Sequence, residues 1–212
     1  SEKLKLKEKS DVVSEQYELA KKRKSNKDAS VFFITWAQNN TPVHEGFLTN
    51  LEAYAKKHKA EIHAILGRYK NPTSVFQDAD EEFWADEIVQ YMDASRHNIH
   101  KYVTIMGDIK VQPTAVNPMS GMQALSGVDS CIFGAPKVQM ETIPVLEGMK
   151  PKMMITTGAV TQRNYTDSKS GKLGEFHHVL GFCIVEIKDD NTFFIRNVTA
   201  DDKTGNFSDL YY

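Results

Sequence analysis

The chain has 212 residues, of which 41% are hydrophobic and 25% are charged, and its formal net charge is −2. This balance is typical of a globular protein with a core of its own, and it excludes an intrinsically disordered chain. No signal peptide opens the sequence and no apolar run approaches the roughly 18 residues needed to cross a bilayer, so we expect a cytoplasmic protein without a membrane partner.

The first 29 residues differ from the rest in being rich in lysine and poor in bulky side chains. Ser10 is a candidate N-cap of a short helix, with Val13, Tyr17 and Ala20 at helical spacing. We expect residues 1–29 to form an arm with this helix, and residues 30–212 to form one α/β domain. Such a helix is typical of a docking or oligomer-forming element, and nucleic-acid binding is the alternative.

The domain opens with the pattern of a βαβ unit. Residues 31–36 are a continuous apolar run, residues 43–59 carry a helical apolar stripe, and residues 61–66 supply a second strand. The two strands are therefore expected to be parallel neighbours with a right-handed crossover. A helix over 80–94 and a strand over 102–106 should follow.

Beyond Asp129 the alternation of helices and strands gives way to strands, after a short helix expected near 119–125. The turn 189–191 predicts that the last two strands form a hairpin. The expected strands are 130–133, 138–141, 153–157, 178–187 and 192–197. The predicted fold class is α/β, with a mixed sheet whose N-terminal half is parallel and is followed by antiparallel strands.

Three expected strands end in unusually polar turns, at residues 38–40, 67–71 and 107–110. Ligands of open α/β sheets gather at the carboxyl ends of parallel strands. Brought to one edge, these turns would offer Arg68 and Lys110 as phosphate ligands. The alternative is that turns between strands and helices are polar without binding anything.

Residues 155–181 form the densest polar segment that follows an expected strand, and we take it as the first candidate site. Arg163, Lys169 and Lys172 could bind phosphates, and Tyr165 could stack on a base. The segment lacks the GxxxxGK[ST] spacing of a phosphate-binding P-loop. A surface hairpin would have a similar composition.

Three residues in or near this segment are weak candidates for general acid/base catalysis. Glu175 and His177 would share one face of the strand that we expect there, and Asp108 follows an earlier strand end. His177 and His178 would point to opposite faces and could not hold one ion unless the backbone turns there. Asp108 or Asp167 could complete a metal site with Glu175 and His177, but lone histidine pairs are more often structural, so we predict no metal ligand.

The other histidines and the cysteines carry no predicted function. His97 and His100 flank the expected helix end and should lie on the surface. Cys131 and Cys183 lie in apolar runs and should be small buried hydrophobes without a disulfide.

Several longer phrases, among them AQNNTPVHEGFLTNLEAYAKKH, MGDIKVQPTAVNPMSGM and TTGAVTQRNYTDSKSGKLGEFHHVLG, are more specific than composition explains. Over residues 31–210 they resemble the N-terminal region of phage-encoded host-DNA-degradation (first-step-transfer) proteins. The resemblance implies a C-terminal calcineurin-type metallophosphoesterase nuclease domain beyond this region, with Mn or Mg as its metal. The aromatic ending at Tyr212 fits such a continuation, or else an apolar terminus that docks on the core.

The metallophosphoesterase motifs themselves are not found here. They place two metals with DxH, GDxxD or GDxxN, GNH and GHxH motifs at strand ends, and only Gly107-Asp108 is similar to one of them. The first hypothesis is therefore a DNA-associated, homo-oligomeric module whose nuclease centre lies in a following domain. The second is a self-contained enzyme acting on a phosphoester or nucleotide, with Asp108, Glu175 and His177 as acid/base candidates.

Overall fold

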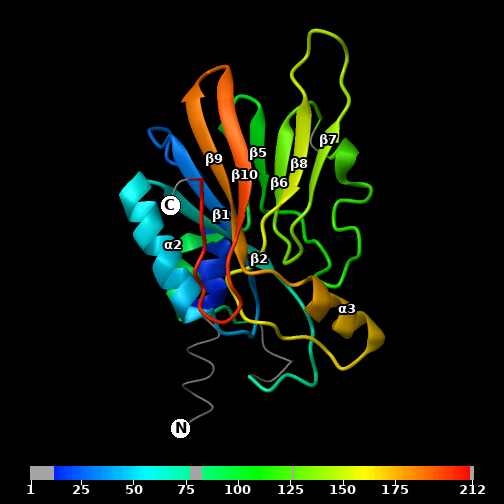
Figure 1. Ribbon diagram of the computed structural model, residues 1–212. Coiled ribbons are helices and arrows are strands. Elements are labelled where there is room, and N and C mark those ends of the chain that lie inside the picture. The colour runs from blue at the N-terminus through cyan, green and yellow to red at the C-terminus, as the bar shows by residue number, and fades with distance from the viewer. Residues whose placement is uncertain (1–11, 77–82, 126, 211–212) are drawn as a thin grey trace.

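The computed structural model describes residues 12–76, 83–125 and 127–210, in which ten strands form two five-stranded sheets (Figure 1). The first sheet has the order β10-β9-β1-β2-β3, and the second has the order β4-β5-β6-β8-β7. The strands of the first sheet are β1 (Val31–Gln38), β2 (Glu61–Gly67), β3 (Met92–Asp93), β9 (Gly181–Asp189) and β10 (Thr192–Thr199). Those of the second are β4 (Arg96–His100), β5 (Val103–Met106), β6 (Ser130–Phe133), β7 (Met140–Ile143) and β8 (Lys152–Thr156).

The expected βαβ unit is confirmed, because β1 and β2 pair in parallel and helix α2 (Glu45–His58) connects them. The helix begins where the ring Nδ1 of His44 accepts a hydrogen bond from the backbone N–H of Phe47. It ends at Lys59, whose left-handed backbone lets its N–H reach back to the last turn. In Figure 1, α2 covers the outer face of the first sheet.

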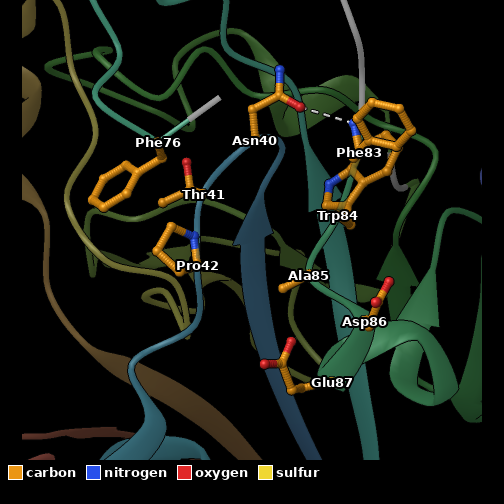
Figure 2. Close-up of a pocket in the computed structure, with 9 residues that line it drawn as sticks. All are labelled: Asn40, Thr41, Pro42, Phe76, Phe83, Trp84, Ala85, Asp86 and Glu87. Carbon is orange, nitrogen blue, oxygen red and sulfur yellow. Dashed lines mark hydrogen bonds between the residues drawn. The ribbon is translucent and has the colours of Figure 1, made fainter. Parts of the chain in front are cut away.

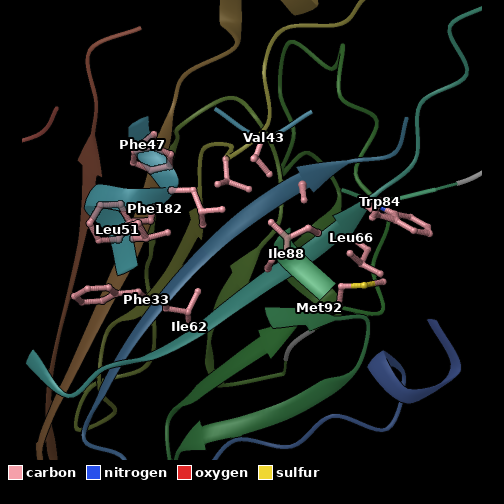
Figure 3. Close-up of a cluster of buried hydrophobic side chains, with 14 of the residues drawn as sticks. Phe33, Val43, Phe47, Leu51, Ile62, Leu66, Trp84, Ile88, Met92 and Phe182 are labelled. Carbon is pink, nitrogen blue, oxygen red and sulfur yellow. The ribbon is translucent and has the colours of Figure 1, made fainter. Parts of the chain in front are cut away.

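Strand β1 is apolar on both faces because both are buried. Phe33 faces the layer of α2, where it meets Phe47, Leu51 and Phe182 (Figure 3). Trp36 points the other way, into the layer between the two sheets. The helical residues 12–20 belong to the outer core, to which Val13 and Ala20 contribute, so this helix docks on its own domain.

The parallel strands of both sheets run in one direction. Strand β1 is parallel to β2, and β5 is parallel to β6 and β6 to β8. A parallel bridge from Trp36 to Ala159 joins the two groups just beyond β8. The carboxyl ends of β1, β2, β5, β6 and β8 therefore share one edge, which we call the carboxyl-end edge. Helix α3 (Lys169–His177) lies at this end of the molecule, away from the turn between β9 and β10 (Figure 1).

The α/β class and its mixed pairing are confirmed, as is the hairpin of β9 and β10. The second half is not purely antiparallel, since β6 and β8 pair in parallel, and the strands divide between two sheets instead of one. Among the described residues, no helix is both long enough and apolar enough to span a bilayer.

Two expected elements were wrong in kind. The helix expected over 80–94 lies partly outside the described residues, and the rest is a 3-10 helix, η1 (Asp86–Tyr91), followed by β3. Its apolar residues are buried as expected, but Met92 pairs with Ala64 of β2, so sheet pairing overrides helical spacing. Near 119–125, where a short helix was expected, the described residues form the 3-10 turn η2 (Met122–Ala124). The strand expected over 178–187 is confirmed as β9, although it begins at Gly181.

Candidate functional site

The floor of the carboxyl-end edge is a buried network of amide side chains. The amide nitrogen of Gln38 donates to the backbone oxygen of Asn164 at 2.7 Å, and that of Asn71 donates to Asn164 Oδ1 at 2.8 Å. Asn164 in turn donates to the Thr41 hydroxyl at 3.0 Å. These side chains carry no charge and cannot act as general acids or bases near neutral pH. The network therefore fixes the loops of this edge and offers no acid/base chemistry.

Tyr165 and His178 extend this network, and Tyr165 has a different role from the predicted one. Its hydroxyl lies 2.8 Å from Nδ1 of His178, whose Nε2 lies 2.9 Å from the backbone oxygen of Thr161. Because a carbonyl can only accept, Nε2 carries the proton and Nδ1 accepts from the tyrosine. Burial lowers the pKa of His178 to about 4, so its ring is neutral. The Tyr165 ring contacts Tyr69 and His178, which leaves it poorly placed to stack on a base.

Residues 155–181 contain helix α3, which the sequence analysis did not predict. The Ser168 hydroxyl caps it by accepting from the Gly171 N–H at 3.1 Å. Gly171 and Gly174 are buried where α3 meets the preceding loop, whereas Lys169 and Lys172 are exposed.

The helical backbone also corrects the predicted pairing of Glu175 and His177. Residues two apart lie on nearly opposite sides of a helix, so the two do not share a face as they would on a strand. Burial lowers the pKa of His177, and the nearby charge of Lys137 lowers it further. Asp108 is bound instead by Arg96 of β4, whose Nε lies 3.1 Å from each carboxylate oxygen. No hydrogen bond or ion pair in the described residues joins Asp108 to either of them.

Two of the predicted phosphate ligands meet at the carboxyl-end edge. The Arg68 guanidinium lies 4.7 Å and the Lys110 ammonium 5.8 Å from the centre of the Tyr17 ring, which stacks on Trp84. Lys110 also donates to the backbone oxygen of Leu66 at 3.0 Å. The turns after β2 and β5 are thus brought together as expected, but their cations contact the N-terminal helix.

The remaining predicted cations divide into a paired one and two exposed ones. Arg163 forms an ion pair with Asp202, so its charge is offset locally. Lys169 and Lys172 stand on the first turn of α3 and form no ion pair within the described part of the chain. They are therefore the predicted phosphate ligands that are best exposed to a polyanion.

A pocket of about 270 Å³ borders the end of β1 (Figure 2). Asn40 fixes one wall, because its side-chain oxygen accepts from the Phe83 N–H at 2.9 Å. Asp86 and Glu87 line the same pocket, and their negative charges disfavour phosphate. The remaining lining residues are Thr41, Pro42, Phe76, Trp84 and Ala85.

Beside the turn that follows β5, where the Gly107 N–H donates to the backbone oxygen of Ser95 at 2.9 Å, His63, Asp93 and His97 form a buried cluster that the sequence analysis missed; we call it the His–Asp cluster. Their ligand atoms lie within 4.8 Å of one another, and no other His, Cys, Asp or Glu group in the described ranges meets that geometry. Nδ1 of His63 lies 2.7 Å and Nε2 of His97 lies 3.6 Å from Oδ2 of Asp93. His97 was expected on the surface, but its side chain is only 10% exposed.

Electrostatics tie this cluster to Glu61, whose Oε1 lies 3.2 Å from Nε2 of His63 without a well-aligned hydrogen bond. Burial favours the neutral ring of His63, but its interactions with Asp93 and Glu61 outweigh burial and raise its pKa. Burial also opposes ionisation of Asp93, yet the hydrogen bond from His63 lowers the pKa of that carboxyl. For His97 burial dominates and lowers the pKa.

Comparison with known proteins supports a phage relationship. Protein A1 of Escherichia phage T5 is 32% identical over 194 residues, which cover 87% of this chain and 34% of that protein. The chain thus spans about a third of the length of this relative. No family model matches the chain. Among solved structures, Vps29 of Chaetomium thermophilum aligns with 85% of this chain and 94% of its own at 8% identity, and the TM-score of 0.42 is too low to support an argument.

Proposed function

We propose that this domain is the DNA-contacting, assembly-forming module of a phage protein that degrades host DNA, with the nuclease centre in a following domain. The observation that carries the DNA contact is the exposed pair Lys169 and Lys172, placed by α3 at the carboxyl-end edge. The sequence resemblance to host-DNA-degradation proteins supports the biological role. The 32% identity with a phage T5 protein supports the phage context.

The chemistry of this helix favours a phosphate backbone as the ligand. The N-terminus of a helix carries partial positive charge and backbone N–H groups that attract anions. Lys169 and Lys172 add full charges on the same turn, and lysine contacts to phosphate supply affinity without base recognition. Because Tyr165 is engaged with His178, base stacking does not contribute. We therefore expect binding that is salt-dependent and indifferent to base sequence.

The self-contained enzyme is the weaker alternative. Its three candidate groups are held apart. Asp108 forms an ion pair with Arg96, and Glu175 lies on a different side of α3 from His177. A general base must lie within hydrogen-bond reach of the proton that it removes, and general acid/base pairs work in concert. The buried amides at the edge do not replace them.

The test is DNA binding by the purified chain, measured by fluorescence anisotropy of a labelled duplex over a series of salt concentrations. Changing Lys169 and Lys172 together to Ala should weaken binding and reduce the slope of log K against log salt by about 2, since each lost phosphate contact changes it by about 1. The matched control changes Lys56 and Lys188, both exposed, one on α2 and the other on β9.

The control variant loses the same charge but should bind like the wild type. If both variants lose the same DNA affinity, the loss comes from the change in net charge, and the proposed contact on α3 is contradicted. Plasmid cleavage in the presence of Mn²⁺ or Mg²⁺, abolished by His177→Ala, would favour the enzyme instead. Light scattering of the purified chain tests assembly, and a monomer at every concentration would remove that part of the proposal.

A further inference from the structure

We propose that the His–Asp cluster binds one first-row transition-metal dication of the zinc class, with His63 Nδ1, Asp93 Oδ2 and His97 Nε2 as its ligands. The three residues come from β2, β3 and β4, so the ion would join the first sheet to the second. His63 and Asp93 have fully buried side chains, and that of His97 is 10% exposed.

The tautomer of His97 is the first argument. Its Nδ1 lies 3.0 Å from the Ser95 hydroxyl, which also lies 2.6 Å from the backbone oxygen of Arg23. The same hydroxyl also lies 3.0 Å from Asp93 Oδ1, and its one proton goes to one of these two oxygens, which can only accept. The hydroxyl oxygen is therefore left to accept from Nδ1–H of His97. Nε2 then presents a lone pair towards the Asp93 carboxylate.

Within the described part of the chain that lone pair has no hydrogen-bond partner, although the atom is buried. Two electron pairs, from His97 Nε2 and Asp93 Oδ2, therefore face each other across 3.6 Å. Buried polar atoms without partners are rare, and an unfilled one needs an explanation. Two ligands on a tetrahedral ion, each about 2.0 to 2.1 Å from it, lie roughly 3.4 Å apart. A cation between the two atoms fits this spacing.

The second argument is that each ligand already has the outer partner that a metal site requires. Metal-bound histidines almost always donate their other ring N–H to a carboxylate, carbonyl or hydroxyl group. Glu61 stands at Nε2 of His63, and Ser95 at Nδ1 of His97. The second oxygen of Asp93 accepts from the Ser95 backbone N–H at 3.0 Å. The His97 ring and the Asp93 carboxylate are thus fixed before any ion arrives, whereas Nε2 of His63 lies near Glu61 without a well-aligned hydrogen bond.

The donor set identifies the class of ion. Two imidazole nitrogens and one carboxylate oxygen suit Zn²⁺ and its neighbours, whereas Mg²⁺ and Ca²⁺ prefer oxygen ligands throughout. His63 Nδ1 lies 2.7 Å from Asp93 Oδ2, a hydrogen-bond distance, so the proton between them must leave as the ion enters. A water molecule would complete four-coordination. The proton is released to solvent, and no redox step is involved.

This site and the proposed DNA contact rest on different elements, although the site borders the turn after β5, which belongs to the carboxyl-end edge. Asp93 and His97 flank the short crossover in which the chain leaves β3 of the first sheet and enters β4 of the second. His63 lies four residues before the carboxyl end of β2. An ion there would hold the two sheets together at the β3–β4 crossover, so we expect it to raise the melting temperature.

The experiment uses the full chain, stripped with a chelator and titrated with ZnCl₂ by isothermal calorimetry. We expect one ion per chain and a higher melting temperature. Co²⁺ should give the intense visible bands of a tetrahedral site. His97→Gln should abolish these bands and the stoichiometric binding, and Ser95→Ala should weaken binding about 10- to 100-fold, as loss of an outer partner does.

The matched control is His100→Gln, on the same strand, because His100 is also buried and, among the described residues, its ring hydrogen-bonds to the backbone of Asp189 and Tyr102. Binding should survive in this variant. Circular dichroism establishes that each variant is folded, and Asp93→Asn provides a second ligand variant if His97→Gln is not. Unchanged zinc affinity in a folded ligand variant, or only the weak pale bands of octahedral Co²⁺, would overturn the proposal and assign the binding to surface histidines.

Discussion

Gly171 gives the sharpest stability prediction, because α3 approaches the preceding loop through it. A Cβ added at this position would lie 1.8 Å from the backbone oxygen of Thr166 and 2.6 Å from its hydroxyl oxygen. A backbone oxygen cannot rotate away, so Gly171→Ala must displace the helix or the loop. Overpacking of this kind costs about 1–3 kcal/mol, which exceeds the roughly 1 kcal/mol that alanine contributes through helix propensity.

Because the Cβ would lie only 1.8 Å from a backbone oxygen, we expect a cost in the upper part of this range, about 2–3 kcal/mol, and so a net loss of about 1–2 kcal/mol. For a chain of 212 residues this loss lowers the melting temperature by about 2–8 °C. Thermal unfolding followed by circular dichroism measures this shift. DNA affinity should fall as well, because both lysines of α3 move although neither is changed. The control is Ser170→Ala, since Ser170 is the exposed neighbour on the same helix. If Gly171→Ala is as stable as the wild type, the close approach of α3 to Thr166 is refuted.

Three further predictions concern buried titratable groups. The pKa of His178 is near 6.5 in the unfolded chain and about 4 in the folded one. The neutral ring therefore contributes up to about 3 kcal/mol to the free energy of unfolding above pH 6.5, and this contribution is lost as the pH falls towards 4. Urea unfolding of His178→Gln should show a flatter pH dependence over this range. Burial and Asp209 together raise the pKa of Tyr54 to about 12, and Asp209→Asn should lower it in an ultraviolet titration, whereas an unchanged value would leave burial as the sole cause. Burial raises the pKa of the Cys183 thiol, and Cys131 is also buried, so a thiol reagent should label the native chain slowly and the urea-unfolded chain rapidly.

Sequence patterns predicted the elements whose signals are local. The apolar run of β1, the stripe of α2 and the turn between β9 and β10 each depend on a few consecutive residues, and each formed as expected. Both cysteines are buried, as their apolar runs indicated. The division into two sheets was not predictable in this way, because it depends on which distant strands pair. Likewise, α3 has two glycines in nine residues, a composition that argues against a helix until tertiary contacts support it.

In the candidate site, too, local features were predictable from the sequence and contacts between distant residues were not. Polar turns after β2 and β5 predicted a shared edge correctly, but which side chains remain exposed there depended on contacts with Tyr17 and Asp202 that lie far away in sequence.

The His–Asp cluster was hidden by one wrong period. Assigned to a helix, Asp93, Ser95 and His97 point in different directions, and His97 falls at a helix end on the surface. In the extended chain from β3 into β4, alternate residues share a face, so Asp93, Ser95 and His97 come together. His63 completes the group from β2, where it lies among apolar residues and interrupts their pattern. A buried histidine in an apolar strand, followed by an acid and a second histidine at alternate positions, is therefore a pattern from which the cluster could be predicted once the segment is assigned to strands. The two proposals rest on different residues, because the DNA contact depends on the lysines of α3 and the ion site on the His–Asp cluster of β2, β3 and β4. Loss of zinc binding in His97→Gln should consequently leave DNA affinity intact, and loss of DNA affinity in the Lys169 and Lys172 variant should leave zinc binding intact.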